Sequence, residues 1–134
     1  MDAIKSVAYV AHPLGSGEDR EQNRANAAKW CAWIVQNLGV AVCADWIILS
    51  GEMEETPENR SLGLDCDFSQ IYICHLFISC GGRHSPGMVQ ERDVALRAGL
   101  PAFDVTPFGY EPPKTELGRE SVLNLLGPNF PFGP

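Results

Sequence analysis

Glu91 stands in the first turn of a helix that we expect to begin just after the segment Ser85-Pro86-Gly87. The helix dipole favours an acidic side chain there, lowers its pKa and keeps it ionised. An ionised carboxylate can act as a nucleophile or an ion-pair partner, but acidic residues are also common at helix starts for structural reasons alone. Helical periodicity aligns Glu91 with Met88, Ala95 and Ala98, so we expect its side chain to face the packed side of the helix.

The loop 80–88 before this helix has the composition of an anion-binding loop. Gly81, Gly82 and Gly87 would let the backbone approach a ligand closely, and Ser85 adds a hydroxyl. Free N–H groups at the helix start, here those of Gly87 and Met88, would suit phosphate or carboxylate, and Arg83 could add a charge-assisted bond. The structural alternative is that Ser85 is the N-cap residue of the helix and Pro86 its first residue.

Two further loops carry polar residues at the ends of expected strands. His12 follows the first apolar run, and Asp45 with Trp46 follows the second. His12 could contact a ligand or be a hydrogen-bonded structural residue. Asp45 and Trp46 together offer an acceptor and a stacking surface for a nucleobase, while a buried Trp46 beside a turn residue is an equal alternative.

The elements that must position these residues follow from apolar patterning. The apolar runs 6–12, 40–44, 71–79 and 101–105 predict strands, and the segments 20–37, 57–69, 88–98 and 116–126 predict helices. Strands that are apolar throughout and alternate with helices indicate an α/β fold with a mainly parallel sheet. We therefore expect a single-domain Rossmann/flavodoxin-like three-layer sandwich with a mainly parallel four- to five-stranded sheet.

Ligands in such folds bind outside the carboxyl ends of the strands. This rule selects the loops 12–20, 45–56 and 80–88, and it places His12, Asp45 and Glu91 at one crevice.

The overall composition narrows the classes of function. A chain of 134 residues is expected to form one domain, 1–134. The net charge of −7 argues against a nucleic-acid polymer as partner. We find no apolar run of membrane-spanning length and no secretion leader, so no membrane partner and a cytoplasmic location are the expectation.

The cysteines predict neither disulfides nor a metal site. Five cysteines, mostly in apolar surroundings, fit reduced and buried thiols. The segment "CHLFISCGGRH" offers candidate ligands, but neighbouring strand residues such as Cys74 and His75 point to opposite faces. We therefore expect no metal.

Several segments resemble the nucleoside 2-deoxyribosyltransferase-like superfamily, and within it a subgroup of small bacterial and phage proteins. They are "AYVAHPLGSGEDREQNRANAAKWCAWI", "VAVCADWIILSG", "PENRSLGLD" and "SPGMVQERDVALRAGLPAFDV". The resemblance covers roughly residues 6–105, and its most specific part runs from Ser85 to Glu91. It implies a domain core at 6–105 and a C-terminal tail, 106–134, that packs on a neighbouring subunit.

The resemblance implies that Glu91 is a nucleophile that attacks the anomeric carbon of a nucleoside. In having serine at position 85, the chain resembles the branch of the superfamily that hydrolyses nucleoside 5′-monophosphates. In that branch the serine helps to hold the phosphate. The expected activity is therefore hydrolysis or transfer at an N-glycosidic bond, without a cofactor. Asp45 and His12 are the candidates for the acid that serves the leaving base, and the candidate substrate-binding residues are Tyr9, Trp46, Arg83, Ser85, Gly87 and Met88.

The chain also departs from the superfamily pattern. His75 stands where related sequences often have aspartate, and in the tail only Asn124 and Asn129 are candidates for a residue lent to a neighbouring subunit. The alternative is a non-catalytic module that binds or sequesters a nucleotide derivative on the same fold. A homodimer or larger homo-oligomer is expected from the resemblance and from the apolar tail "NLLGPNFPFGP".

Overall fold

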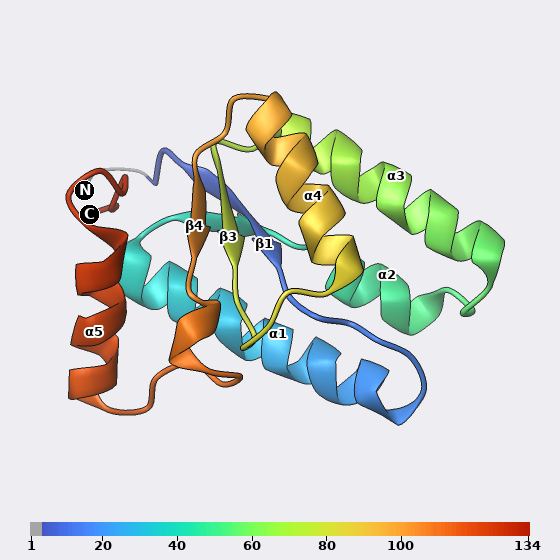
Figure 1. Cartoon of the computed structure of the whole chain (residues 1–134), viewed down its shortest axis with the longest axis horizontal. Coiled ribbons are helices and arrows are strands. Elements are labelled where there is room, and N and C mark those ends of the chain that lie inside the picture. Colours follow the sequence, from blue (N-terminus) through green and yellow to red (C-terminus); the bar gives the residue numbers. More distant parts are fainter. Residues whose placement is uncertain (1–3) are drawn as a thin grey trace.

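The computed structural model describes residues 4–134, in which a four-stranded sheet lies between two layers of helices (Figure 1). The strands are β1 (Val7–Ala11), β2 (Ala41–Cys43), β3 (Leu76–Ser79) and β4 (Ala102–Asp104). The helices are α1 (Glu18–Leu38), α2 (Trp46–Glu52), α3 (Pro57–Ile73), α4 (Pro86–Arg97), a 3₁₀ turn η1 (Thr106–Phe108) and α5 (Glu116–Leu126).

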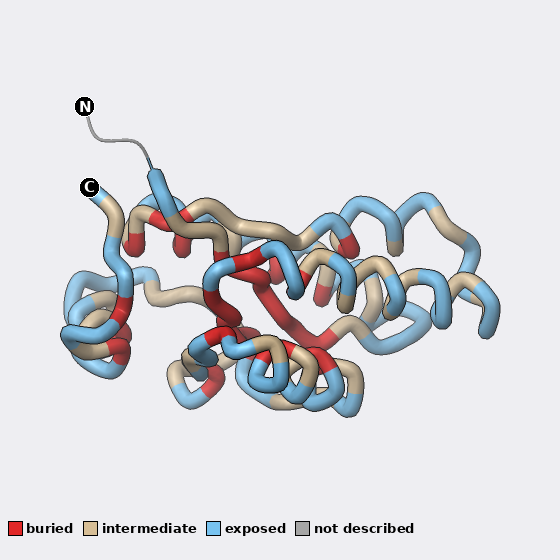
Figure 2. The backbone as a smooth tube through the Cα atoms, turned by 90° about the horizontal axis from the view of Figure 1, so that it is seen from above, coloured by how far each residue is buried: buried red, intermediate tan, exposed pale blue. Residues whose placement is uncertain are grey.

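All strand pairs are parallel, and the strand order is β2-β1-β3-β4. The predicted fold class, an α/β three-layer sandwich of the Rossmann/flavodoxin type, is confirmed. Because successive strand residues face opposite sides, Ala8 and Val10 of β1 pack against α1 and α5, whereas Tyr9 and Ala11 pack with residues of α3 and α4. Figure 2 shows buried residues concentrated in the central strands and exposed residues on the outward faces of the helices.

Two predicted elements are wrong in detail. The run 71–79 is not one strand: α3 continues to Ile73, Cys74 takes an extended conformation, and β3 begins at Leu76. The β-branched residues Ile71 and Ile73 favour a strand locally, but burial of Ile71 against the sheet continues the inner face of α3. The expected loop 45–56 contains helix α2, which begins at the buried Trp46.

The helix ends agree better with the predictions from the sequence. Thr56 caps α3 by accepting a hydrogen bond from the Asn59 N–H, and Pro57 is the first helical residue, as predicted. Gly39 ends α1 in the left-handed conformation, at φ 67°. Helix α5 occupies 116–126, as expected.

The C-terminal tail packs on the core of its own chain. Val122, Leu126 and Phe130 are buried there, and the Phe130 ring lies 4.8 Å from that of Phe103. A single chain therefore covers much of the apolar surface from which we expected an oligomer, and the homo-oligomer stays a prediction from the resemblance alone. Within residues 4–134, no helix combines the length and apolar character that a membrane span needs.

Candidate functional site

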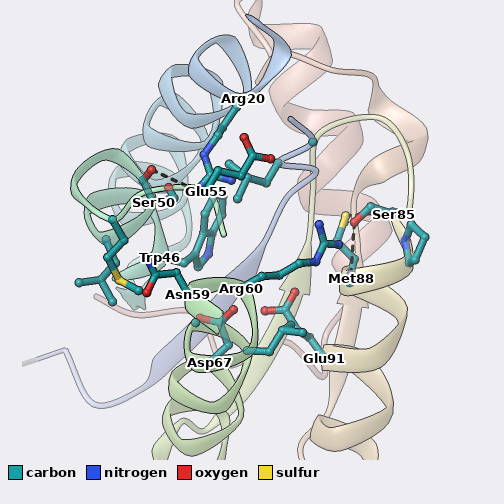
Figure 3. Close-up of a pocket in the computed structure, with 18 of the residues that line it drawn as sticks. Arg20, Trp46, Ser50, Glu55, Asn59, Arg60, Asp67, Ser85, Met88 and Glu91 are labelled. Carbon is teal, nitrogen blue, oxygen red and sulfur yellow. Dashed lines mark hydrogen bonds between the residues drawn. The ribbon is translucent and has the colours of Figure 1, made fainter. Parts of the chain in front are cut away.

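A cavity of about 540 Å³ opens at the carboxyl edge of the sheet, between α2, α3, α4 and the loops that follow β1 and β3 (Figure 3). Of the predicted site residues, those that line it are His12, Trp46, Arg83, Ser85, Gly87, Met88 and Glu91. All three selected segments, 12–20, 45–56 and 80–88, therefore meet at one cavity, although most of 45–56 is helix α2 rather than a loop, and the start of α3 supplies the remaining wall.

Glu91 is the acidic residue that the structure buries most deeply at this cavity. It is 7% exposed and lies on the buried face of α4 with Met88 and Ala95, as the periodicity predicts. The expected position in the first turn is wrong, because α4 already begins at Pro86 and Glu91 therefore falls in the second turn. The Tyr9 hydroxyl donates a hydrogen bond to Glu91 Oε2. Tyr9 is fully buried in β1, so Glu91 is held by the centre of the sheet rather than by its own helix alone.

A second carboxyl, that of Asp67 on α3, lies within hydrogen-bonding reach of both Glu91 and Tyr9. Burial, and then the negative charge of Asp67, raise the pKa of Glu91 to about 8. Burial raises the pKa of Asp67 to about 6. Between these values the two carboxyls share one proton.

The lowered pKa that we expected for Glu91 from the helix dipole is therefore wrong. A dipole contributes a few tenths of a kcal/mol at a helix start, whereas removal of a carboxylate from water and a second carboxylate nearby act more strongly in the opposite direction.

His12 lines the cavity, but both of its ring nitrogens are engaged. Nδ1 lies 2.7 Å from the Pro13 carbonyl oxygen, and Nε2 lies 2.8 Å from the Asn26 amide nitrogen. Burial lowers the pKa of His12, so the ring is neutral at neutral pH, donates through Nδ1 and accepts through Nε2. The loop after β3 comes so close that a Cβ on Gly81 would lie 2.6 Å from the His12 ring. This arrangement matches the structural alternative for His12.

Asp45 does not line the cavity. Its side chain is exposed and accepts a hydrogen bond of 2.7 Å from Gln70. Trp46, the next residue, points inward, and its indole N–H donates to the Val10 carbonyl at 3.0 Å. The indole is thus a fixed apolar wall of the cavity, and only Trp46 of this predicted pair reaches the site.

The start of α4 shows both predicted properties of its loop. Ser85 is the N-cap residue, and its hydroxyl accepts the Met88 N–H at 3.3 Å, as the structural alternative states. Pro86 has no N–H, which leaves the Gly87 N–H as the free backbone donor of the first turn. Met88 contributes its side chain to the cavity wall, but its N–H is already used.

His84 anchors the same loop to β4. Its Nε2 lies 3.0 Å from Asp104 Oδ2 and 3.3 Å from the Thr106 hydroxyl. Thr106 in turn donates through its N–H and its hydroxyl to Asp104. Because His84 lies between Arg83 and Ser85, this network sets the position of the loop that carries both residues.

Two cavity residues on α3, Arg60 and Asp67, were not predicted. With Leu64 and Ile71 they follow a helical spacing, 60, 64, 67 and 71, in which Ile71 is fully buried and the others line the cavity. That stripe is visible in the sequence, and an arginine and an aspartate at helical spacing from Leu64 and Ile71 are the signal that could have identified them, although Arg60 itself is exposed and Asp67 is half-buried.

The residues that we considered as metal ligands make other contacts in the structure. His75 Nδ1 accepts the Val7 N–H, and the Cys80 thiol is buried beside the Ala11 carbonyl. All five cysteines are free thiols. Among residues 4–134, no group of three or more His, Cys, Asp or Glu side chains is arranged to hold a metal ion.

The fold and the cavity together define an α/β protein whose candidate site brings the buried Glu91, the half-buried Asp67 and arginines to the carboxyl edge of a parallel sheet. Residues 6–104 match the model of a family described as "Domain of unknown function (DUF7768)", and the chain belongs to this family. A search of curated proteins found no match to the chain.

Proposed function

We propose that the protein cleaves the N-glycosidic bond of a nucleoside 5′-monophosphate or a nucleoside, by hydrolysis or by transfer, with Glu91 as the nucleophile. The observation that carries the proposal is the buried Glu91 carboxyl at the cavity wall, held by the Tyr9 hydroxyl and adjacent to Asp67. Burial of two carboxyls side by side opposes folding, and such groups are concentrated where a protein performs chemistry. The resemblance to the nucleoside 2-deoxyribosyltransferase-like superfamily supplies the substrate class.

The Tyr9 hydroxyl favours the productive arrangement of the shared proton. The pKa of Glu91 is the higher of the two, so between about pH 6 and pH 8 the shared proton resides mainly on Glu91, and the Tyr9 hydrogen bond stabilises the less populated form in which Glu91 is the carboxylate and Asp67 holds the proton. In that form Glu91 is the nucleophile and Asp67 is the acid. Asp67 therefore replaces Asp45 and His12, which are respectively outside the cavity and fully hydrogen bonded, in our proposal for the acid.

The reaction then proceeds in two steps. A Glu91 oxygen bonds to C1′ of the sugar while the bond from C1′ to the base nitrogen breaks, and the Asp67 proton goes to the departing base. In the second step Asp67 takes a proton from water, or from an acceptor base, whose free electron pair attacks C1′ and releases Glu91. This sequence matches the double displacement of retaining glycoside hydrolysis, and it requires no metal or organic cofactor.

The remaining cavity residues suit the rest of such a substrate. Trp46 offers an apolar face for a base, and Arg83, Ser85 and the Gly87 N–H offer donors for a phosphate.

The test is chromatographic analysis after incubation with common ribo- and deoxyribonucleoside 5′-monophosphates and the matching nucleosides. We expect a free base to appear with the wild-type protein and not with Glu91→Gln, which should still bind the substrate. Full activity in Glu91→Gln would exclude Glu91 as the nucleophile. Binding without any release of base by the wild type would instead support the non-catalytic binding module.

A further inference from the structure

Two asparagines, Asn23 and Asn26, lie on the buried face of α1, where an amphipathic helix presents mostly apolar side chains. They are 6% and 3% exposed. Burial of an amide costs free energy unless protein partners replace its hydrogen bonds to water. Both amides bind Tyr110 of the C-terminal tail, and each also binds the loop that follows β1.

Asn23 connects Tyr110 to a wall of the cavity. The Tyr110 hydroxyl donates to Asn23 Oδ1 at 2.8 Å, and Asn23 Nδ2 donates to the Leu14 carbonyl at 2.8 Å. A Cβ on Gly15 would lie in van der Waals contact with the same amide nitrogen, at 3.6 Å. Because Leu14 and Gly15 line the cavity, the Asn23 amide links the Tyr110 ring to the position of that wall.

Asn26 connects Tyr110 to His12. Its Nδ2 donates to the Tyr110 carbonyl at 2.7 Å and lies 2.8 Å from His12 Nε2, and the carbonyl also accepts the Trp30 indole N–H at 2.6 Å. Within residues 4–134, Asn26 Oδ1 has no hydrogen-bond partner. The two acceptors that its nitrogen serves therefore orient the amide, and the amide in turn keeps the proton of the neutral His12 ring on Nδ1.

Tyr110 also contacts the loop that follows β3. A Cβ on Gly82 would lie 3.0 Å from the Tyr110 nitrogen, and a Cβ on Gly81 would lie 2.6 Å from the His12 ring. The rings of Tyr110 and His12 meet edge to face, with centroids 5.6 Å apart. Arg83, the next residue of this loop, lines the cavity. Figure 1 shows this part of the tail beside α1 and the loop that leads from β3 to α4.

We propose that Tyr110 is a positioning residue that holds the loops after β1 and β3 together, and so shapes the ligand-binding wall of the cavity in its own chain. The carboxyls of Glu91 and Asp67 are held from α4 and α3. Tyr110 therefore acts on ligand binding rather than on the chemical step, because a ligand that meets a loose wall must also order it. The effect on KM rests on the proposed function, whereas the effect on the two loops does not.

The first experiment is steady-state kinetics of Tyr110→Phe, which removes only the hydrogen bond to Asn23. KM for the nucleotide or nucleoside that releases a base should rise about 3- to 10-fold, the range for one hydrogen bond, and kcat should change less than about 2-fold. Tyr72→Phe is the matched control, because Tyr72 is exposed on α3 outside the cavity, and it should change neither constant. Lower thermal stability of Tyr110→Phe with both constants unchanged would show a purely structural role and overturn the proposal. A lower kcat at unchanged KM would overturn it as well.

Asn26→Asp tests the connection to His12. Aspartate has the same shape but no N–H, so it can donate neither to the Tyr110 carbonyl nor to His12 Nε2. The ring nitrogen resonances of His12 should then show a proton on Nε2, which is unprotonated in the wild type, and KM should rise at least as much as in Tyr110→Phe. Asn37→Asp is the control, because Asn37 lies on the same helix, donates to the Trp33 carbonyl and does not line the cavity. Unchanged His12 resonances in Asn26→Asp would overturn the proposal.

Hydrogen exchange of the free protein separates failure of this inference from failure of the proposed function. Tyr110→Phe should speed the exchange of amides in 12–17 and 80–85 about 3-fold or more, and leave the amides of α4 beyond its first turn unchanged. If it does so, but the wild type releases no base from any nucleotide or nucleoside, the positioning role stands and the glycosidase proposal fails. Unchanged exchange in both loops would overturn the positioning role, whether or not a base is released.

Discussion

Replacement of Glu91 by glutamine should make the protein more stable at neutral pH while it removes activity. The pKa of Glu91 is raised to about 8 in the folded protein, from an ordinary value of 4.5. The folded state therefore holds a proton that the unfolded chain releases, so the free energy of unfolding falls as the pH rises from about 4.5 to about 8. Glutamine removes this dependence, and its amide can still accept from Tyr9 and donate to Asp67.

The magnitude follows from the size of the pKa shift. Each pH unit between the unfolded and folded pKa values costs the wild type about 1.4 kcal/mol relative to a group that does not titrate. At pH 7 the interval from 4.5 is about 2.5 units, which sets a ceiling of about 3 kcal/mol for the gain in Glu91→Gln. We expect a gain of about 2–3 kcal/mol at pH 7 that shrinks to about 1 kcal/mol or less at about pH 5.

The assay is urea unfolding of the wild type and Glu91→Gln at intervals between about pH 5 and pH 8, with the slope of unfolding against urea compared between the two proteins. Asp93→Asn is the matched control, because Asp93 is exposed on the same helix and lies outside the cavity. Wild-type and Glu91→Gln stabilities that run parallel across this range would refute the buried, shared-proton arrangement. A variant less stable than the wild type at pH 7 would refute it equally.

Three other expectations test the site. The rate of cleavage should be bell-shaped in pH, with limbs near 6 and 8, because the reaction needs one proton on the pair Asp67 and Glu91; a profile that keeps rising above pH 8 would contradict this. Tyr9→Phe should lower kcat about 10- to 100-fold with little loss of stability, whereas Tyr72→Phe at an exposed position should change neither, as measured by steady-state kinetics and thermal unfolding. Ser85→Ala should cost about 1 kcal/mol of stability as a lost helix cap and also weaken nucleotide binding. Thr115→Ala, which removes the equivalent cap of α5, should cost similar stability and leave binding unchanged.

Much of the fold could be predicted because the patterns that specify it are local. The apolar run at 6–12 and the caps at Thr56, Pro57 and Gly39 each act within a few residues. The prediction was wrong where local β-propensity and tertiary packing favour different structures. The segment from Ile71 to Ile73 favours a strand by its β-branched residues, but it forms the end of α3, whose buried face continues through Ile71. The helix α2 was missed because packing of Trp46 under the Val10 carbonyl, rather than any cap in the segment, holds its start.

The same distinction between local patterns and tertiary packing applies to the site. Sequence alone could place Glu91 on the inward face of a helix and Ser85 at its start, because both statements depend on helical spacing. It could not say that Asp45 turns away to Gln70 or that Asp67 meets Glu91, since these depend on how α3 and α4 pack. Tyr9 and Glu91 are 82 residues apart in the chain, and their hydrogen bond exists only because a parallel sheet brings the middle of β1 beneath α4. The sequence determines which chemical groups are present. Their pKa values and their pairing arise from burial and long-range contacts, which only the tertiary structure decides.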